Sequence, residues 1–300
     1  MTELDLSALL ESWRLHLRAE RKSAETIKNY TTGVTQFLAY CQREDVPAVL
    51  DRPTVNAFVA SVLDGGAEAA TARARQLGVR RFSAWLAEEG EVPRDELLGL
   101  KPPKLDEKIT ERLSDAQCLA LIKACKPLGK EDFRGYRDEA LVRFMLECVV
   151  RAGEVISMET GTTNATAGVT RVFGKGRKWR EVSFGPQTAR ALDRYLRMRK
   201  THRLADTPAL WLGDRGKGLG YYGLYSALDY RAQLAGIENF HPHLTRHTAA
   251  QRWLAAGGSE GGLMAVAGWT RRDMLDRYTK ATASERAAAE ARSLNLGDFS

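Results

Sequence analysis

The sequence predicts a mainly α-helical protein with a small β-sheet, an α+β fold divided into two domains. Three observations carry this prediction. Apolar residues recur at helical spacing throughout residues 1–98. The next stretch, residues 99–112, contains two adjacent prolines and almost no periodicity, which is typical of a linker. Residues 113–300 combine further helical segments with one pair of short strands, which predicts a second and larger domain.

The composition is that of a globular protein with an excess of positive charge. The 300 residues are 44% hydrophobic and 28% charged, the formal net charge is +7, and the sequence pI is about 9.3. A chain of this length buries a sizeable core and more often forms two domains than one. The charge favours a polyanionic partner such as DNA or RNA, because Lys and Arg contacts with phosphates release counterions. A basic surface that is simply solvated is the alternative.

Cysteine usage and the N-terminal residues indicate a cytoplasmic protein with no membrane partner. The cysteines include no C-x-x-C pair, so we expect small apolar residues in a reducing compartment and neither a disulfide frame nor a zinc site. The N-terminus carries acids where a signal peptide carries bases, and no apolar run approaches the roughly 18 residues of a membrane span. The four cysteines are Cys41, Cys118, Cys125 and Cys148.

Four helices are expected in the first domain. The first has an apolar face over residues 6–17, and the second has one over 27–41 with Ser23 as its cap. The third begins at "DRPTVNAFVASVL" with Pro53 in its first turn and ends at a pair of glycines. The fourth is "AATARARQLGVRRFSAWLAEEG".

Four arginines on the fourth helix lie beside its apolar stripe. They form either a solvated face or a surface that contacts the DNA backbone or major groove, and the small all-helical setting favours DNA. These residues are Arg73, Arg75, Arg80 and Arg81.

The second domain opens with a helix that Ser114 caps, followed by "YRDEALVRFMLECVVRAGEVISM", an amphipathic helix expected to end near Gly153. The segments "GVTRVF" and "WREVSF" flank "GKGRK", which is the composition of a β-hairpin whose turn presents lysines. Further helices are expected over residues 186–200, 222–236, 244–256 and 273–280.

The stretch "HPHLTRHTAAQRW" places three histidines and an arginine within seven positions. His243 and His247 are four residues apart, so on a helix they share a face, as two zinc ligands do. The stretch lacks an H-E-x-x-H glutamate, however, and Arg246 beside the histidines repels a cation, so no metal site is expected. Histidines that merely cap or pack the start of a helix after Pro242 are the structural alternative.

Arg151 follows two apolar residues at the end of the expected helix, and a semi-buried guanidinium requires an anion. Glu154, three residues on, is placed to orient it. Together with residues further along the chain, Arg151 makes a set of two arginines, one lysine, two N–H donors and one phenol, which is what metal-free phosphodiester chemistry by a tyrosine requires. The set is Arg151, Lys175, His243, Arg246, Trp269 and Tyr278.

In order and spacing, these residues resemble the boxes of the tyrosine site-specific recombinases, also called phage integrases. "CVVRAGE" is similar to T-G-x-R-x-x-E, with Val149 and Val150 at positions that usually hold small residues. "GKGRK" matches the hairpin box that carries the catalytic lysine, and "HLTRHT" matches H-x-x-R-H-T. In "AGWTRRDMLDRY", Trp269 stands where most members have histidine, and the tyrosine is Tyr278.

The resemblance covers nearly the whole chain and implies the Xer-like two-domain architecture. The domains expected are a SAM-like core-binding domain over 1–98 and a recombinase catalytic domain with a C-terminal tail helix over 113–300. Thr282 and Glu285 fit a capping box for this tail helix. The helix either packs on its own domain or, as the family suggests, docks on a neighbouring protomer.

The resemblance also implies the chemistry. Tyr278 attacks phosphorus to give a 3′-phosphotyrosyl bond, while the arginines, His243 and Trp269 stabilise the pentavalent transition state. Lys175 donates the proton to the leaving 5′-hydroxyl, and His243 is the expected general base. "GDRGKGLG" offers Lys217 as a rival lysine in a loop. Supporting roles fall to Glu154 and His247, and DNA contacts at the hairpin to Arg177 and Lys178.

The resemblance predicts a recombinase or integrase that works through a Holliday junction on double-stranded DNA, as a tetramer on DNA and a monomer in free solution. It needs no cofactor, neither metal nor ATP. A type IB topoisomerase with the same chemistry and a catalytically inactive DNA-binding homologue are the rival classes. We expect a bacterial or phage-encoded protein at the nucleoid. Phage integration, chromosome dimer resolution and movement of a mobile element or cassette all remain open.

Overall fold

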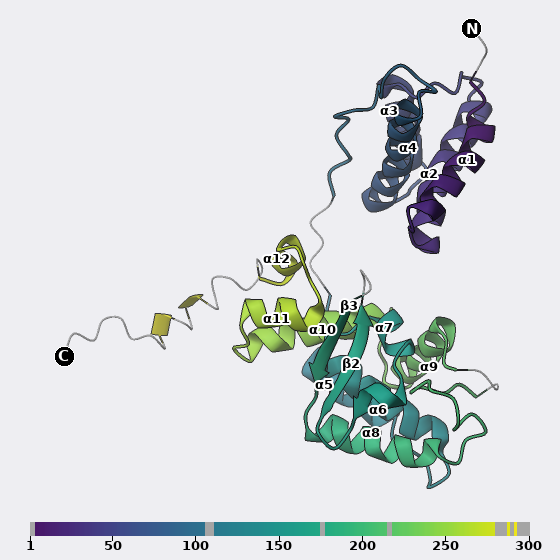
Figure 1. Cartoon of the computed structure of the whole chain (residues 1–300). Coiled ribbons are helices and arrows are strands. Elements are labelled where there is room, and N and C mark those ends of the chain that lie inside the picture. The colour runs from purple at the N-terminus through teal and green to yellow at the C-terminus, as the bar shows by residue number, and fades with distance from the viewer. Residues whose placement is uncertain are drawn as a thin grey trace. The chain divides into compact units, whose positions relative to one another are not determined.

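The chain separates into two compact units, Met1–Lys108 and Ile109–Ser300. In Figure 1 the first unit contains helices alone, and the second contains helices around a small sheet. This arrangement confirms the predicted fold class, while the domain boundaries at residues 98 and 112 stay predictions. The computed structural model describes residues 4–105, 111–174, 178–214, 218–279, 287–288 and 291–292.

In its described residues the first unit is built from four helices, and capping side chains mark the starts of the first three. The Asp5, Ser23 and Asp51 side chains each accept a hydrogen bond from a backbone N–H in the first turn that follows. The apolar faces meet in two clusters, one around Trp13 and the other around Phe37. The helices are α1 (Leu6–Ala19), α2 (Ala24–Arg43), α3 (Arg52–Asp64) and α4 (Ala69–Glu88).

Two glycines allow α2 and α4 to pack backbone to backbone. A Cβ atom on Gly33 would lie 2.5 Å from the carbonyl oxygen of Arg75, and one on Gly78 would collide with the carbonyl of Tyr30. This close contact fixes how α4 presents its arginines. Arg73 and Arg81 are exposed, whereas Arg75 and Arg80 are partly buried.

The second unit has one core beneath a three-stranded sheet. Its centre includes Phe144, Tyr195 and Trp211, and Tyr195 stacks on Trp211 with ring centroids 5.2 Å apart. The helices are α5 (Asp115–Ala124), α6 (Phe133–Glu147), α7 (Ala152–Ile156), the 3-10 turn η1 (Thr160–Thr162), α8 (Pro186–Arg199), α9 (Tyr221–Leu234), α10 (Pro242–Ala255), α11 (Glu260–Ala267) and α12 (Asp273–Thr279), and the strands are β1 (Thr163–Asn164), β2 (Val169–Gly174) and β3 (Lys178–Ser183).

The sheet is antiparallel with the strand order β1-β2-β3, and its last two strands form the predicted hairpin. The register pairs Val169 with Ser183 at one end and Gly174 with Lys178 at the other. Because side chains alternate along a strand, Arg180 lies on the same face as the buried Val182. The hairpin therefore directs one arginine inward, toward α7 and α11.

A second small cluster in this unit joins α10, α11 and α12. Leu263, Ala267, Trp269, Leu275 and Tyr278 are all buried in it. Gly268, with φ of 62° and ψ of 42°, ends α11 in the left-handed conformation that glycine adopts without strain. The turn sends the chain back through Trp269 into α12, so Trp269 and Tyr278 lie against the same helices.

Two expectations about the second unit were wrong. The helix expected to continue to Gly153 ends at Glu147, and Arg151 stands at the N-cap of α7 instead of at a helix end. The break falls at Val149, whose φ of +51° is left-handed and incompatible with a continuing helix. Helix α11 and strand β1 were not predicted, because the glycines of "SEGGLMAVAG" weaken a helical pattern and β1 is only two residues long.

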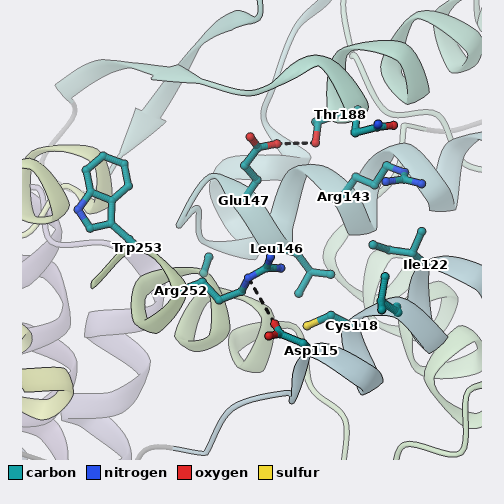
Figure 2. Close-up of a pocket in the computed structure, with 12 residues that line it drawn as sticks. Asp115, Cys118, Ile122, Arg143, Leu146, Glu147, Thr188, Arg252 and Trp253 are labelled. Atoms are coloured by element: carbon teal, nitrogen blue, oxygen red, sulfur yellow. Dashed lines mark hydrogen bonds and ion pairs between the residues drawn. The ribbon is translucent and has the colours of Figure 1, made fainter. Parts of the chain in front are cut away.

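A surface pocket of about 520 Å³ lies between α5, α6, α8 and α10 (Figure 2). Arg252 pairs with Asp115 at 3.7 Å on one side, and Thr188 donates a hydrogen bond to Glu147 on the other. Glu147 also accepts from the backbone N–H of Gly185 and so caps α8. The residues that line this pocket include none of those predicted to be catalytic.

All four cysteines are buried and in the thiol form, as expected of small apolar residues. Among the residues that the structure describes, no helix combines the length and the apolar character that crossing a bilayer requires.

Candidate active site

The carboxylate of Glu154 organises the site. Its Oε2 accepts from the backbone N–H of Arg151 at 2.8 Å and from Arg180 Nη2 at 2.8 Å, and its Oε1 accepts from Arg151 Nη1 at 2.9 Å and Arg180 Nη1 at 3.0 Å. Burial by itself raises the pKa of this carboxyl, but the hydrogen bonds and positive charges of Arg180 and Arg151 outweigh it and lower the pKa below its usual value. Glu154 is therefore ionised and holds Arg151 in place, the orienting role predicted for it.

Arg246 lies at the base of the site with only 1% of its surface exposed. Its Nη1 donates to the carbonyl of Val149, its Nη2 donates to the carbonyl of Ala267 at 2.8 Å, and its guanidinium lies 3.9 Å from Glu154. Burial, followed by the charge of Arg151, lowers the pKa of Arg246 to about 10, so the group stays charged at neutral pH. The left-handed Val149 therefore has a role here, since its carbonyl anchors this arginine.

The site carries an excess of positive charge. Within the described part of the chain, Arg151, Arg180 and Arg246 all surround the single carboxylate of Glu154. A buried excess of like charge is costly unless an anion completes it. Arg151 is the most open of the three, with 30% of its side chain exposed. The electrostatics therefore fit an anionic ligand such as a phosphate group.

Tyr278 is placed beside this charged centre by α12. It is 4% exposed, and its ring stacks on Trp269 with centroids 5.2 Å apart and an interplanar angle of 18°. Burial raises the pKa of Tyr278 to about 12, although the charges of Arg246, Arg277 and Arg151 act in the opposite direction. The hydroxyl is neutral at pH 7 and must lose its proton to a nearby base before it can act as a nucleophile.

His247 lies next to that hydroxyl. Its Nδ1 and the Tyr278 Oη share a hydrogen bond. Burial, with the neighbouring charges of His243 and His241, lowers the pKa of His247 to about 4, so its ring is neutral at pH 7. His243, expected to be the general base, is exposed and packs edge to face on His247 with centroids 4.4 Å apart. Although the residue is exposed, partial desolvation of its ring and the charge of Arg246 also lower the pKa of His243.

Trp269 offers a hydrogen-bond donor to the same space. The residue is 6% exposed, and its Nε1 has no hydrogen-bond partner among the residues that the structure describes. A buried indole N–H usually finds a partner, and Trp85 and Trp211 also lack one here, so Trp269 is distinguished by its position against Arg246. Its ring also lies 5.5 Å from the Arg246 guanidinium.

The structure joins Arg151, Glu154 and Arg246 by ion pairs and His247 to Tyr278 by a hydrogen bond, and Trp269 links the two sets because it lies against Arg246. Trp269 also stacks on Tyr278, and His243 packs on His247. The predicted lysine falls outside the described residues, and so do its neighbour in the hairpin turn and the rival lysine in the later loop. These three are Lys175, Arg177 and Lys217.

The other residue predicted to contact DNA at the hairpin lies within the described part of the chain. Lys178 is exposed at the start of β3, opposite Gly174. Two exposed aromatic residues lie beside it, Phe173 on β2 and Trp179 on β3, and their rings pack 5.1 Å apart across the hairpin.

Sequence reasoning missed Arg180, the second arginine on Glu154. The strand pattern held a signal for it, because a charged residue two positions before a buried valine must face inward and needs a carboxylate there. No group of three or more potential metal-binding side chains gathers anywhere in the described part of the chain.

Comparison with known proteins agrees with this assembly. Residues 111–285 match the phage integrase family, and residues 9–91 match the phage integrase N-terminal SAM-like domain. The tyrosine recombinase XerC of Azotobacter vinelandii is 30% identical over 260 residues, covering 84% of this chain and 83% of that protein. XerC of Pseudomonas aeruginosa is also 30% identical, over 262 residues, covering 85% and 82%.

Solved structures share the fold. The XerH site-specific recombinase bound to a palindromic difH substrate, in a post-cleavage complex, aligns with a TM-score of 0.73 at 17% identity, covering 95% of this chain and 84% of that one. A lambda integrase dimer bound to a COC′ core site aligns with a TM-score of 0.69 at 14% identity, covering 91% and 94%. The chain therefore belongs to the phage integrase family and is a tyrosine recombinase, an enzyme that breaks and rejoins DNA strands.

Proposed function

We propose that this protein is a site-specific recombinase in which Tyr278 cleaves one DNA strand at a time through a 3′-phosphotyrosyl intermediate. The observation that carries the proposal is the stacking of Tyr278 on Trp269 beside an excess of positive charge. A phosphodiester supplies the missing anion. The same phosphate offers oxygens to the unmet indole N–H of Trp269 and to the open side of Arg151.

In the cleavage step the Tyr278 oxygen attacks phosphorus and the bond from phosphorus to the 5′-oxygen breaks. Arg151, Arg246 and the Trp269 N–H stabilise the negative charge that builds up on the non-bridging oxygens. The tyrosine proton passes to the histidine pair, in which His247 contacts the hydroxyl and His243 is the predicted base. Lys175, as the resemblance implies, gives a proton to the departing 5′-oxygen.

Rejoining reverses this step with a different strand. The 5′-hydroxyl of a partner duplex attacks the phosphotyrosyl bond, the new phosphodiester forms, and Tyr278 regains its proton. The covalent link conserves the energy of the broken phosphodiester, so the exchange requires no ATP. Two such exchanges make and then resolve a Holliday junction. Two duplexes present four strands to be cut, so the active assembly proposed is a tetramer on DNA.

The known relatives support a specific DNA partner. The XerH structure contains a difH substrate after cleavage, and the lambda integrase dimer is bound to a core site. Thr282 and Glu285, predicted to cap the tail helix, lie outside the described residues, whereas residues 287–288 and 291–292 are helical. The docking partner of this helix stays a prediction. Because the proposed substrate is chromosomal, phage or mobile-element DNA, we propose that the protein acts at the bacterial nucleoid.

Covalent capture from a random library tests the proposal. Nicked duplexes with a randomised core are incubated with the full chain, and DNA that remains attached to protein in SDS is sequenced. We expect one enriched sequence with wild-type protein. Tyr278→Phe, which loses only the phenolic oxygen, should bind that sequence with unchanged affinity and form no adduct. Recovery of the same adduct from the Phe variant would refute the assignment.

Two further measurements separate the rival functions. EDTA is expected to leave adduct formation unchanged, because arginines supply the charge stabilisation; a loss that zinc or magnesium restores would return the histidines to a metal-binding role. A supercoiled plasmid that lacks the captured sequence should stay supercoiled. Its relaxation would instead identify a type IB topoisomerase.

A further inference from the structure

Arg180 on β3 donates hydrogen bonds both to the carboxylate of Glu154 and to the backbone just before Trp269. Its two terminal nitrogens donate to the two oxygens of Glu154 at 3.0 and 2.8 Å, and its Nε donates to the carbonyl of Val266 at 2.7 Å. Only 14% of the side chain is exposed. Planar, two-pronged binding of a carboxylate fixes direction as well as distance, so Arg180 ties three separate parts of the second unit together.

The contact with Val266 reaches the turn that positions Trp269. Val266 lies in the last turn of α11, and Gly268 follows in its left-handed conformation. A Cβ atom at Gly268 would lie 3.5 Å from the Arg180 guanidinium carbon, so the arginine packs directly against the turn. Trp269 is the next residue. Moving Arg180 therefore moves the backbone that sets where the Trp269 N–H points.

The contact with Glu154 acts on the opposite side of the site. Glu154 also receives both hydrogen bonds that hold Arg151, and it lies 3.9 Å from Arg246. Without Arg180, the carboxylate loses two of its four donors and is free to turn toward Arg246. That change draws Arg151 out of position and neutralises charge on Arg246 that an incoming phosphate needs.

We propose that Arg180 is a positioning residue for strand cleavage, acting through Glu154 on Arg151 and through Val266 on Trp269. The inference rests on the proposed function and adds to it a residue outside the set of six. Arg180 also stands two residues after Lys178, so the hairpin predicted to carry Lys175 is anchored to the same carboxylate as Arg151.

The test uses the full chain and a nicked duplex carrying the sequence that wild-type protein captures covalently. Arg180→Ala is expected to slow single-turnover adduct formation by about 10²-fold, the cost of misplacing reacting groups by about 1 Å. Its affinity for the uncleaved duplex should stay within about threefold of wild type. Arg180→Lys keeps the charge but not the two-pronged geometry, and should recover only part of the rate.

A matched control and a second substrate separate positioning from general damage. Arg171→Ala removes an exposed arginine from the neighbouring strand and should leave the rate unchanged. With sulfur in place of the 5′-bridging oxygen, the leaving group needs no proton. Arg180→Ala should stay slow on this substrate, since it acts on the phosphate-binding groups. Recovery to the wild-type rate would overturn the proposal, because it would show that Arg180 supports only the proton transfer by the hairpin lysine.

A double variant decides the case in which Arg180→Ala does not fold. Arg180→Met combined with Glu154→Gln removes the buried Arg180–Glu154 ion pair as a unit, which proteins tolerate better than the loss of one partner, and Arg246 keeps its two backbone carbonyl acceptors. This pair should fold and should cleave more slowly than Glu154→Gln alone, because Arg180 also acts through Val266, a contact that Glu154→Gln leaves in place. A wild-type rate in the double variant, or in a folded Arg180→Ala, would overturn the inference. Absence of any adduct with wild-type protein would instead overturn the proposed function.

Discussion

The hydroxyl of Tyr278 and the Nδ1 of His247 share a hydrogen bond, and the same tyrosine ring stacks on Trp269. Histidine and tryptophan thus hold the proposed nucleophile from two sides. The histidine comes from α10 and the tyrosine from α12, 31 residues later in the chain. The contact brings His247 within hydrogen-bonding distance of the hydroxyl whose proton must leave, whereas the sequence pointed to His243.

Replacing each histidine separately tests how this proton leaves. His247→Ala is expected to slow adduct formation by about 10²-fold, within the range for loss of a proton acceptor. His243→Ala should slow it as well, because its ring packs on His247. Single-turnover rates on the captured nicked duplex give the comparison. A wild-type rate for His247→Ala would show that His243 alone acts as the general base.

The pKa of His247 also predicts how stability depends on pH. The folded protein lowers this pKa from 6.5 to about 4, so it favours the neutral ring. The resulting stabilisation is complete above pH 6.5 and is lost as the pH falls toward 4, by at most about 3 kcal/mol. Urea unfolding at pH 7 and pH 4.5 measures the change. His247→Phe keeps a ring against Tyr278 without titrating, and should lose less stability over this interval than wild type.

The unmet indole N–H of Trp269 predicts a difference between two aromatic replacements. Trp269→Phe keeps a ring to stack on Tyr278 but removes the donor, and should lower the cleavage rate by about 10²-fold, the usual cost of one transition-state donor. Trp269→His restores an N–H and should retain more activity than the Phe variant. Equal rates for both would show that Trp269 acts by packing alone. DNA affinity, measured by fluorescence anisotropy, should be unchanged in each.

Lys175 can be separated from its neighbours by chemical rescue. Lys175→Ala should slow cleavage of an ordinary phosphodiester by about 10² to 10⁴-fold, as expected for loss of a general acid. On a substrate with sulfur at the 5′-bridging position, its rate should return to near the wild-type value, because a thiolate leaves without a proton. Arg151→Ala and Arg246→Ala should be slow on both substrates. Rescue of Lys217→Ala in place of Lys175→Ala would move the acid to the later loop.

Local signals in the sequence were sufficient for much of the fold. Ser23 and Ser114 cap the helices that they were predicted to cap, because a hydroxyl accepting from the first turn acts within a few residues. The hairpin around "GKGRK" followed from its strand composition. The end of α6 before Val149 was not predicted from the sequence. Val149 adopts a left-handed backbone, and its carbonyl accepts a hydrogen bond from Arg246, which is 97 residues away in the chain.

The sequence by itself determined the family and the order of the two domains, and it singled out Tyr278 as the proposed nucleophile, because each depends on residue types at characteristic spacings. Only the tertiary structure decided which groups touch. In the structure, Arg180 donates hydrogen bonds to Glu154, which is 26 residues away in sequence, and the Tyr278 hydroxyl shares a hydrogen bond with His247. Such pairings depend on how a strand, a short helix and a returning helix pack together, and spacing along the chain carries no record of that geometry.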